Sequence, residues 1–185
     1  MKVLLPLFLL AALTACRKEP IEVRTVPKED APAPASDMAP AERARGVRWT
    51  APSGWKELAG GGGGMRVATF ELPKINGKVE ATVVALPGDV GGELANVNRW
   101  RGQLALAPIA QEDLAAARAT VKTDLGALLV YDFTGTGEKK TRLVAGMIQV
   151  SGTTWFFKLM GEEKAVAAAR PAFLKLLRGL KTDAP

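Results

Sequence analysis

The chain has 185 residues, of which 48% are hydrophobic and 24% are charged, proportions that are typical of a globular protein. Because it has no histidine and a single cysteine, Cys16, it can form no Ser-His-Asp triad, Cys-His pair, disulfide or usual zinc site. Its net charge of +6 is small and its basic and acidic residues are interleaved, so we expect no nucleic-acid binding.

Residues 1–15 predict a secretory signal. A basic Lys2 precedes an apolar stretch that is shorter than the roughly 20 residues a membrane span needs. The four residues LTAC, which end at Cys16, resemble the lipobox of bacterial lipoproteins, where the peptide is cut before a cysteine that then carries acyl chains. We therefore predict lipidation at Cys16. In the alternative, Cys16 is an ordinary residue of a signal that is cleaved elsewhere.

The sequence after Cys16 predicts a tether and then one folded domain. Residues 16–45 contain prolines scattered among alanine and charged residues, a composition that favours an extended or disordered linker. Arg17, rather than aspartate, follows the cysteine and resembles the pattern that sorts lipoproteins to the outer membrane, facing the periplasm. Residues 46–182 then form the predicted globular domain.

The domain begins with alternating residues that predict short strands. Residues 47–49 predict a strand that stops at Pro52, and a turn then brings Trp55 back toward the sheet. Trp49 and Trp55 flank this turn, and we interpret them as core anchors; the alternative is a carbohydrate-binding platform.

Two further strands complete an N-terminal meander. The glycines at 60–64 predict a hairpin loop rather than a nucleotide-binding loop, because no Lys-Ser or Lys-Thr follows them. Alternation predicts strands at residues 66–72 and 78–86, with a turn at 73–77 between them.

The period then changes to that of an amphipathic helix. Apolar residues recur at three- and four-residue steps from Leu94 to Leu104, and Asn96, Arg99 and Gln103 are expected on the polar face. Arg99 and Gln103 are four residues apart, so both can hydrogen-bond one partner group.

Within this helix we predict Arg99, Trp100 and Gln103 as binding residues. In the alternative, Trp100 packs on the sheet and the aliphatic stem of Arg99 covers apolar surface.

The C-terminal half predicts a short helix at 111–119, strands at 120–123, 127–133, 141–150 and 153–160, and a final helix at 162–180. Residues 155–157 are all aromatic, so their strand should be central, with layers on both faces. Pro171 should kink or split the last helix.

This order predicts an α+β domain, a mostly antiparallel sheet with helices packed on it. Three phrases carry a resemblance over residues 47–180: Trp49-x-x-Pro52-x-x-Trp55, Asn98-Arg99-Trp100-Arg101-x-Gln103, and Gly152-x-x-Trp155-Phe156-x-Lys158-x-x-Gly161. They resemble the PsbP/Mog1/DcrB-like group and, more closely, bacterial lipoproteins that share these phrases. The resemblance implies an α/β/α sandwich and non-enzymatic duties, such as those of an assembly factor, a photosystem accessory subunit or a Ran-binding cofactor.

We expect no enzyme, no cofactor, no metal and no catalytic residue. Three carboxylate pairs could support hydrolysis: Asp89 with Glu93, Glu112 with Asp113, and Asp124 with Asp132. The first lies in a turn, the second is explained as a helix start, and Asp132-Phe133-Thr134-Gly135 lacks the other kinase motifs.

The sequence therefore predicts an envelope lipoprotein, held to the membrane by its lipid, whose domain binds a protein partner. The alternative is a module that binds a small ligand or carbohydrate, and a carboxylate-based hydrolase is a third reading.

Overall fold

The computed structural model describes residues 46–59, 65–72 and 75–182. The predicted signal, Cys16, the tether, the glycine loop at 60–64 and the start of the turn at 73–77 lie outside these described residues. The described strands are β1 (Val47–Arg48), β2 (Lys56–Ala59), β3 (Arg66–Glu71), β4 (Val79–Pro87), β5 (Arg118–Thr123), β6 (Gly126–Thr134), β7 (Thr141–Val150), β8 (Thr153–Glu162) and β9 (Lys181–Thr182). The described helices are α1 (Gly92–Gln103), the 3-10 turn η1 (Gln111–Asp113), α2 (Leu114–Ala117) and α3 (Glu163–Arg178).

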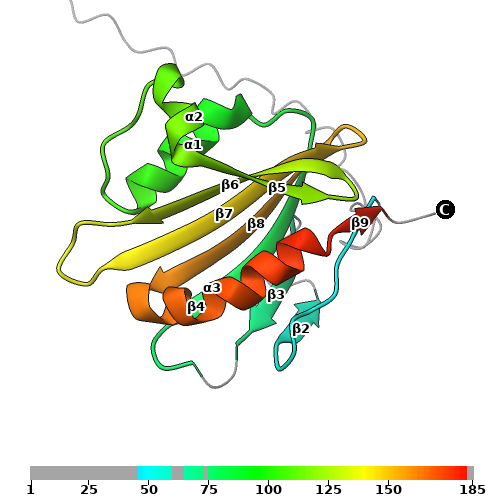
Figure 1. The fold of residues 1–185 in the computed structure, drawn as a ribbon, viewed down its shortest axis with the longest axis horizontal. Helices are drawn as coiled ribbons and strands as arrows, with labels where there is room; N and C mark the ends of the chain where they lie inside the picture. Colours follow the sequence, from blue (N-terminus) through cyan, green and yellow to red (C-terminus); the bar gives the residue numbers. More distant parts are fainter. Residues whose placement is uncertain (1–45, 60–64, 73–74, 183–185) are drawn as a thin grey trace, which may run out of the picture. The chain divides into compact units, whose positions relative to one another are not determined.

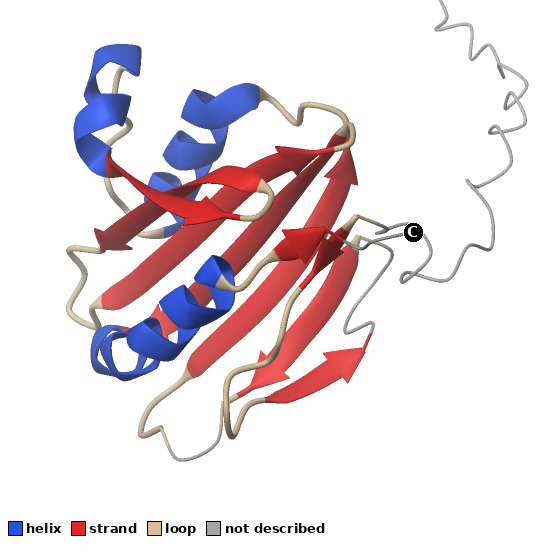
Figure 2. Cartoon of the chain, turned by 45° about the vertical axis from the view of Figure 1, so that its right-hand side comes forward, coloured by secondary structure: helices blue, strands red, loops and turns tan. Residues whose placement is uncertain are grey.

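One antiparallel sheet with the strand order β2-β3-β4-β8-β7-β6-β5 organises the described chain (Figure 1). The meander β2-β3-β4 joins the meander β5-β6-β7-β8 where β4 pairs with β8, from Val79↔Gly161 to Pro87↔Thr153. Separately, β1 pairs with β9. Helices pack against the sheet, with α3 lying across one face (Figure 2). The predicted α+β class is therefore confirmed.

The central strand is β8, as its aromatic run predicts. Trp155 and Phe157 are both fully buried in the apolar cluster that includes α3. Phe156, between them, is buried in a second cluster that includes α1. Because successive side chains of a strand point to opposite faces, β8 supplies aromatic rings to both layers at once.

Two glycines of the third resemblance phrase have clear structural reasons. Gly152 follows Ser151 in the tight turn between β7 and β8, and both have positive φ, +74° and +48°. Gly161 lies against β4, where a Cβ atom would stand 2.1 Å from the Lys78 carbonyl oxygen. Any side chain at position 161 would therefore push β4 away from β8.

Of the kink or split predicted at Pro171, the split does not occur. Helix α3 continues through this proline to Arg178. Both Pro171 and Ala167, whose carbonyl loses its usual donor, are exposed, so water can satisfy that carbonyl. On the other side of the helix, Ala169 and Phe173 are buried before and after the proline and hold the two halves on the sheet.

The predicted second helix is shorter than expected. Only residues 111–117 are helical, and Arg118 and Ala119 already belong to β5, where they pair with Tyr131 and Val130 of β6. Strand pairing overrides the helical propensity of this alanine-rich segment. Within the described ranges, no helix has both the length and the apolar composition required to cross a bilayer.

Candidate functional site

A pocket beside α1 brings together the three residues predicted to bind a partner. It has a volume of about 200 Å³ and lies between α1 and strands β3, β4 and β8. Its lining residues are Arg66, Thr82, Val84, Leu86, Arg99, Trp100, Gln103, Phe156 and Lys158. Arg66 and Thr82 were not singled out from the sequence, and Lys158 was named only in the third resemblance phrase and not as a site residue.

The sheet register aims the strand residues into this pocket. Lys158 of β8 lies opposite Thr82 of β4, and Phe156 lies opposite Val84. Phe156 belongs to the α1 cluster, and Lys158, two residues further along the strand, shares its face. Lys158 interrupts the otherwise apolar run of 155–159, and this is the signal in the sequence that could have marked it as a site residue.

Arg66 reaches the pocket because β3 contains a bulge. Arg66 pairs with Val84, whereas Ala68 pairs with Val83, so the register shifts by one residue between them. A shift of one residue reverses the face to which a side chain points. Ala68 is thereby buried in the α3 cluster while Arg66, two residues earlier, lines the pocket on the α1 side.

The guanidinium of Arg99 is held by Asn96, which the periodicity placed on the polar face of the helix. Asn96 is instead 1% exposed. Its Nδ2 donates to the carbonyl oxygens of Val90, at 2.9 Å, and Gly92, at 2.6 Å. Its Oδ1 accepts a hydrogen bond from Nη2 of Arg99. Asn96 thus fixes the start of α1 and orients Arg99 in one network, which explains why a polar residue is buried there.

Three cations meet in the pocket and one carboxylate lies beside them. Nη1 of Arg66 is 2.5 Å from Oε1 of Glu80. Within the described residues, neither Arg99 nor Lys158 forms an ion pair with a carboxylate. Burial lowers the pKa of Lys158 below its ordinary value; Glu80 opposes this shift, and the charges of Arg66 and Arg99 add to it. The pocket therefore carries an excess of positive charge.

Trp100 is a wall of the pocket rather than an exposed contact. It is 4% exposed, and its ring centroid lies 5.9 Å from Tyr131 and 6.0 Å from Phe156. Trp100 thus packs on the sheet, while Arg99 and Gln103 on the same helix are exposed to solvent. The site offers an apolar wall with positively charged and hydrogen-bonding groups at its edge.

The two N-terminal tryptophans pack against the core, as the sequence predicts for anchors. The Trp49 ring lies edge-on to Trp155 and to Phe157, with both centroid distances 6.1 Å, and Trp55 lies 5.8 Å from Phe70. The Nε1 of Trp49 donates to Glu57 at 3.1 Å. These contacts occupy part of the ring surface that a carbohydrate platform would need to leave exposed.

The carboxylate pairs are engaged in structural contacts. Oδ1 of Asp89 accepts from the backbone N–H of Gly92, at 3.0 Å, and Oδ2 of Asp113 accepts from that of Ala110, at 3.2 Å. Asp89 and Glu93 do line one depression of about 290 Å³. Glu93, however, pairs with Arg118 at 3.1 Å and accepts the hydroxyl hydrogen of buried Tyr131.

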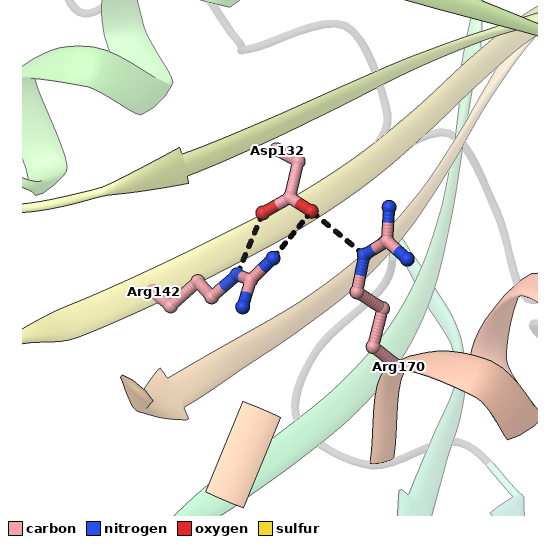
Figure 3. A network of polar contacts seen from close by, with 3 residues as sticks. All are labelled: Asp132, Arg142 and Arg170. Atoms are coloured by element: carbon pink, nitrogen blue, oxygen red, sulfur yellow. Dashed lines mark hydrogen bonds and ion pairs between the residues drawn. The ribbon is translucent and has the colours of Figure 1, made fainter. Parts of the chain in front are cut away.

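Asp132 binds two arginines and orients α3 on the sheet (Figure 3). Its two oxygens accept from Nε and Nη2 of Arg142, both at 2.7 Å, and Oδ2 also accepts from Nε of Arg170 of α3 at 2.7 Å. Asp124 lies in the β5-β6 turn, eight residues before Asp132, and the part of β6 from Gly126 to Asp132 alone spans about 20 Å of strand. The third carboxylate pair is therefore not assembled.

The described residues also line other depressions, among them one of about 550 Å³ at residues 138–140 and 162–164 and one of about 280 Å³ beside Trp49 and Lys181. A wider depression of about 720 Å³ lies between residues 50–53 and the end of α3, and its charged lining residues are Lys175 and Lys181. No group of three histidine, cysteine, aspartate or glutamate side chains in the described ranges is arranged to hold a metal ion.

Comparisons with known proteins found no matching family model and no matching curated protein. Among solved structures, the chain is similar to cyanobacterial PsbP (CyanoP) from Synechocystis, with a TM-score of 0.46 and 11% identity over 75% of this chain and 94% of that one. It is also similar to LpqN, which is involved in cell envelope biogenesis of Mycobacterium tuberculosis, with a TM-score of 0.44 and 12% identity over 74% and 82% of the two chains. A protein from Bacteroides thetaiotaomicron has a TM-score of 0.44 and 12% identity over 75% of this chain, which spans 45% of that longer one.

Proposed function

We propose that this protein is a lipid-anchored protein of the bacterial cell envelope whose domain binds a protein partner and catalyses no reaction. The observation that carries the proposal is the cationic pocket beside α1. Arg66, Arg99 and Lys158 come from three different elements and converge on one small concave surface with a single carboxylate at its rim. Lys158 is half-buried and forms no ion pair within the described residues, and an uncompensated charge of this kind costs stability, so its presence favours a recognition role.

The anchor rests on residues 13–16 and on the composition that follows them. The lipobox-like LTAC predicts acylation of Cys16, and the proline-rich residues 16–45 would let the domain meet a partner at a distance from the bilayer. By the same sequence argument, the outer membrane, on its periplasmic side, is the proposed location.

A partner protein suits the site better than a carbohydrate or an enzyme substrate. Trp100 and Trp155 are buried, and the partly exposed Trp49 and Trp55 pack against the core, so none of the four is a fully exposed ring of the kind that a sugar platform presents. The pocket is below the size of most small-molecule sites, which are about 300–1,000 Å³. It is large enough to hold one side chain of a larger partner.

Site-specific photocrosslinking in native envelopes tests the proposal. A crosslinking residue replaces Gln103, which is exposed at the pocket, and a matched one replaces exposed Lys175 of α3. We expect a discrete protein to be captured from position 103 alone, and capture to fall at least about tenfold when Arg99→Gln is added.

Two outcomes would contradict the proposal. One is equal capture from positions 103 and 175, and the other is capture that does not change with Arg99→Gln. The anchor is tested in the same cells, where Cys16→Ser should release the protein from the membrane fraction. If the Cys16→Ser protein remained with the membranes, the proposed lipid anchor at Cys16 would be wrong.

A further inference from the structure

The charge of the pocket indicates what kind of group it accepts. Glu80 is held by Arg66, whereas Arg99 has only the neutral oxygen of Asn96 as its described partner and Lys158 has no hydrogen bond or ion pair within the described residues. Both cations line the same pocket. An anion placed there would gain charge-assisted hydrogen bonds from exposed Arg99 and from Lys158, which is already partly desolvated.

The walls indicate what the anion is attached to. Val84, Leu86, Trp100 and Phe156 form apolar lining next to the cations. Methylene groups would gain from contact with such a wall, whereas an inorganic anion would lose hydration against it. The volume of about 200 Å³ suits one side chain with a charged end.

We propose that this pocket binds the carboxylate of a glutamate or aspartate within an acidic, apolar-flanked segment of the partner protein, an inference that rests on the proposed function. The incoming carboxylate lies between Arg99 and Lys158, and its aliphatic stem lies on Phe156 and Trp100. Gln103, exposed at the pocket rim, is free to hydrogen-bond the backbone of the segment. Glu80, bound to Arg66, shows that a carboxylate already sits against one of the pocket cations.

Titration of the full chain, purified in detergent, with defined probes tests this inference. The probes are the peptides acetyl-Leu-Glu-Leu-amide and acetyl-Leu-Gln-Leu-amide, together with inorganic phosphate. They are compared with one another at the same ionic strength, and salt is then raised in a separate series. The readout is the indole N–H resonance of Trp100, assigned with Trp100→Phe. We expect saturable shifts with the glutamate peptide, at least about tenfold weaker binding of the glutamine peptide, and weaker binding as salt is raised.

Matched variants distinguish binding in the pocket from a general attraction of the peptide to positive charge on the protein. Arg99→Gln and Lys158→Met should each weaken binding of the glutamate peptide by about tenfold or more. Lys122→Met of β5 and Arg178→Gln of α3, both exposed and outside the pocket, should leave it unchanged. Because Arg99 is exposed, Arg99→Gln should fold even if the strand variant does not.

The inference is overturned if the glutamine peptide binds as well as the glutamate peptide, or if Lys122→Met weakens binding as much as Arg99→Gln. It is also overturned if phosphate shifts the Trp100 resonance while the glutamate peptide does not, because the site would then recognise a phosphate group. Position-specific capture from residue 103 without peptide binding would refute the carboxylate and leave the proposed function standing. Peptide binding with no captured protein would refute the function.

Discussion

The two faces of the sheet differ in how their charged side chains are partnered. Under α3, the apolar cluster is continuous and the charged group Asp132 is closed by Arg142 and Arg170 at 2.7 Å each. Beside α1, Asn96 and Thr82 are buried within the fold and the cations of the pocket keep open hydrogen-bonding capacity. The carboxylate under α3 is therefore paired within the fold, whereas the α1 face carries two cations, Arg99 and Lys158, that form no ion pair within the described residues. We therefore expect substitutions on the α3 face to lower the free energy of unfolding, and substitutions beside α1 to weaken partner binding instead.

The largest effect should come from an aromatic residue of the α3 face. Phe157→Ala removes a side chain that is 0% exposed at the centre of the sheet, and we expect a loss of about 3–5 kcal/mol in the free energy of unfolding, because a cavity replaces the ring. Urea unfolding measures it. On the other face, Gln103→Ala should change stability by less than about 0.5 kcal/mol, because the Gln103 side chain is exposed and forms no hydrogen bond within the described residues. A large loss from Gln103→Ala would break the separation of stability from recognition.

An intermediate effect should come from the closed charge cluster. Asp132→Asn leaves Arg142 and Arg170 without their carboxylate and should cost about 1–3 kcal/mol at neutral pH, measured by urea unfolding. An exposed match, Asp124→Asn, should cost less than about 0.5 kcal/mol. Equal effects of the two variants would show that α3 does not depend on this cluster.

The same cluster predicts the direction of a pH dependence. Burial would raise the pKa of Asp132, but hydrogen bonds from Arg142 and then from Arg170 outweigh burial and hold that pKa below its ordinary value. The unfolded state therefore binds a proton first as the pH falls, so this stabilisation is present above about pH 4 and is lost as the pH falls through the lowered pKa. Unfolding curves between pH 7 and 2 should converge for the native chain and Asp132→Asn.

The smallest effect on stability should come from the pocket lysine. Lys158→Met removes a partly desolvated charge and keeps the length of the side chain, so we expect stability at neutral pH to stay equal or rise by less than about 1 kcal/mol. Because the pKa of Lys158 is lowered in the folded state, its penalty is present at neutral pH and disappears as the pH rises above the unfolded value near 10.4. The advantage of Lys158→Met in urea unfolding should therefore shrink at high pH. A loss above about 1 kcal/mol would mean that Lys158 stabilises the fold.

Much of the fold could be predicted from local patterns. The apolar alternation of residues 78–86 and 141–160 predicted the inner strands, and Trp155, Phe156 and Phe157 in succession predicted that their strand is central. Pro171 does not split α3 because its cost falls on the solvent side of the helix. Residues 118 and 119 were assigned to the short helix that begins at 111, whereas pairing with β6 places them in β5.

The sequence by itself determined the fold class, the lack of histidine and disulfide chemistry, and the placement of Arg99, Trp100 and Gln103 on one helix. Only the tertiary structure decided which strand residues meet that helix. Lys158 reaches the pocket through the register of β4 and β8, and Arg66 reaches it because a one-residue bulge reverses its face. A pattern along the chain reports which face a residue takes within its own strand, while register and bulges are set by pairing between segments far apart in the sequence. That pairing made a cationic pocket out of residues from four separate elements of the fold.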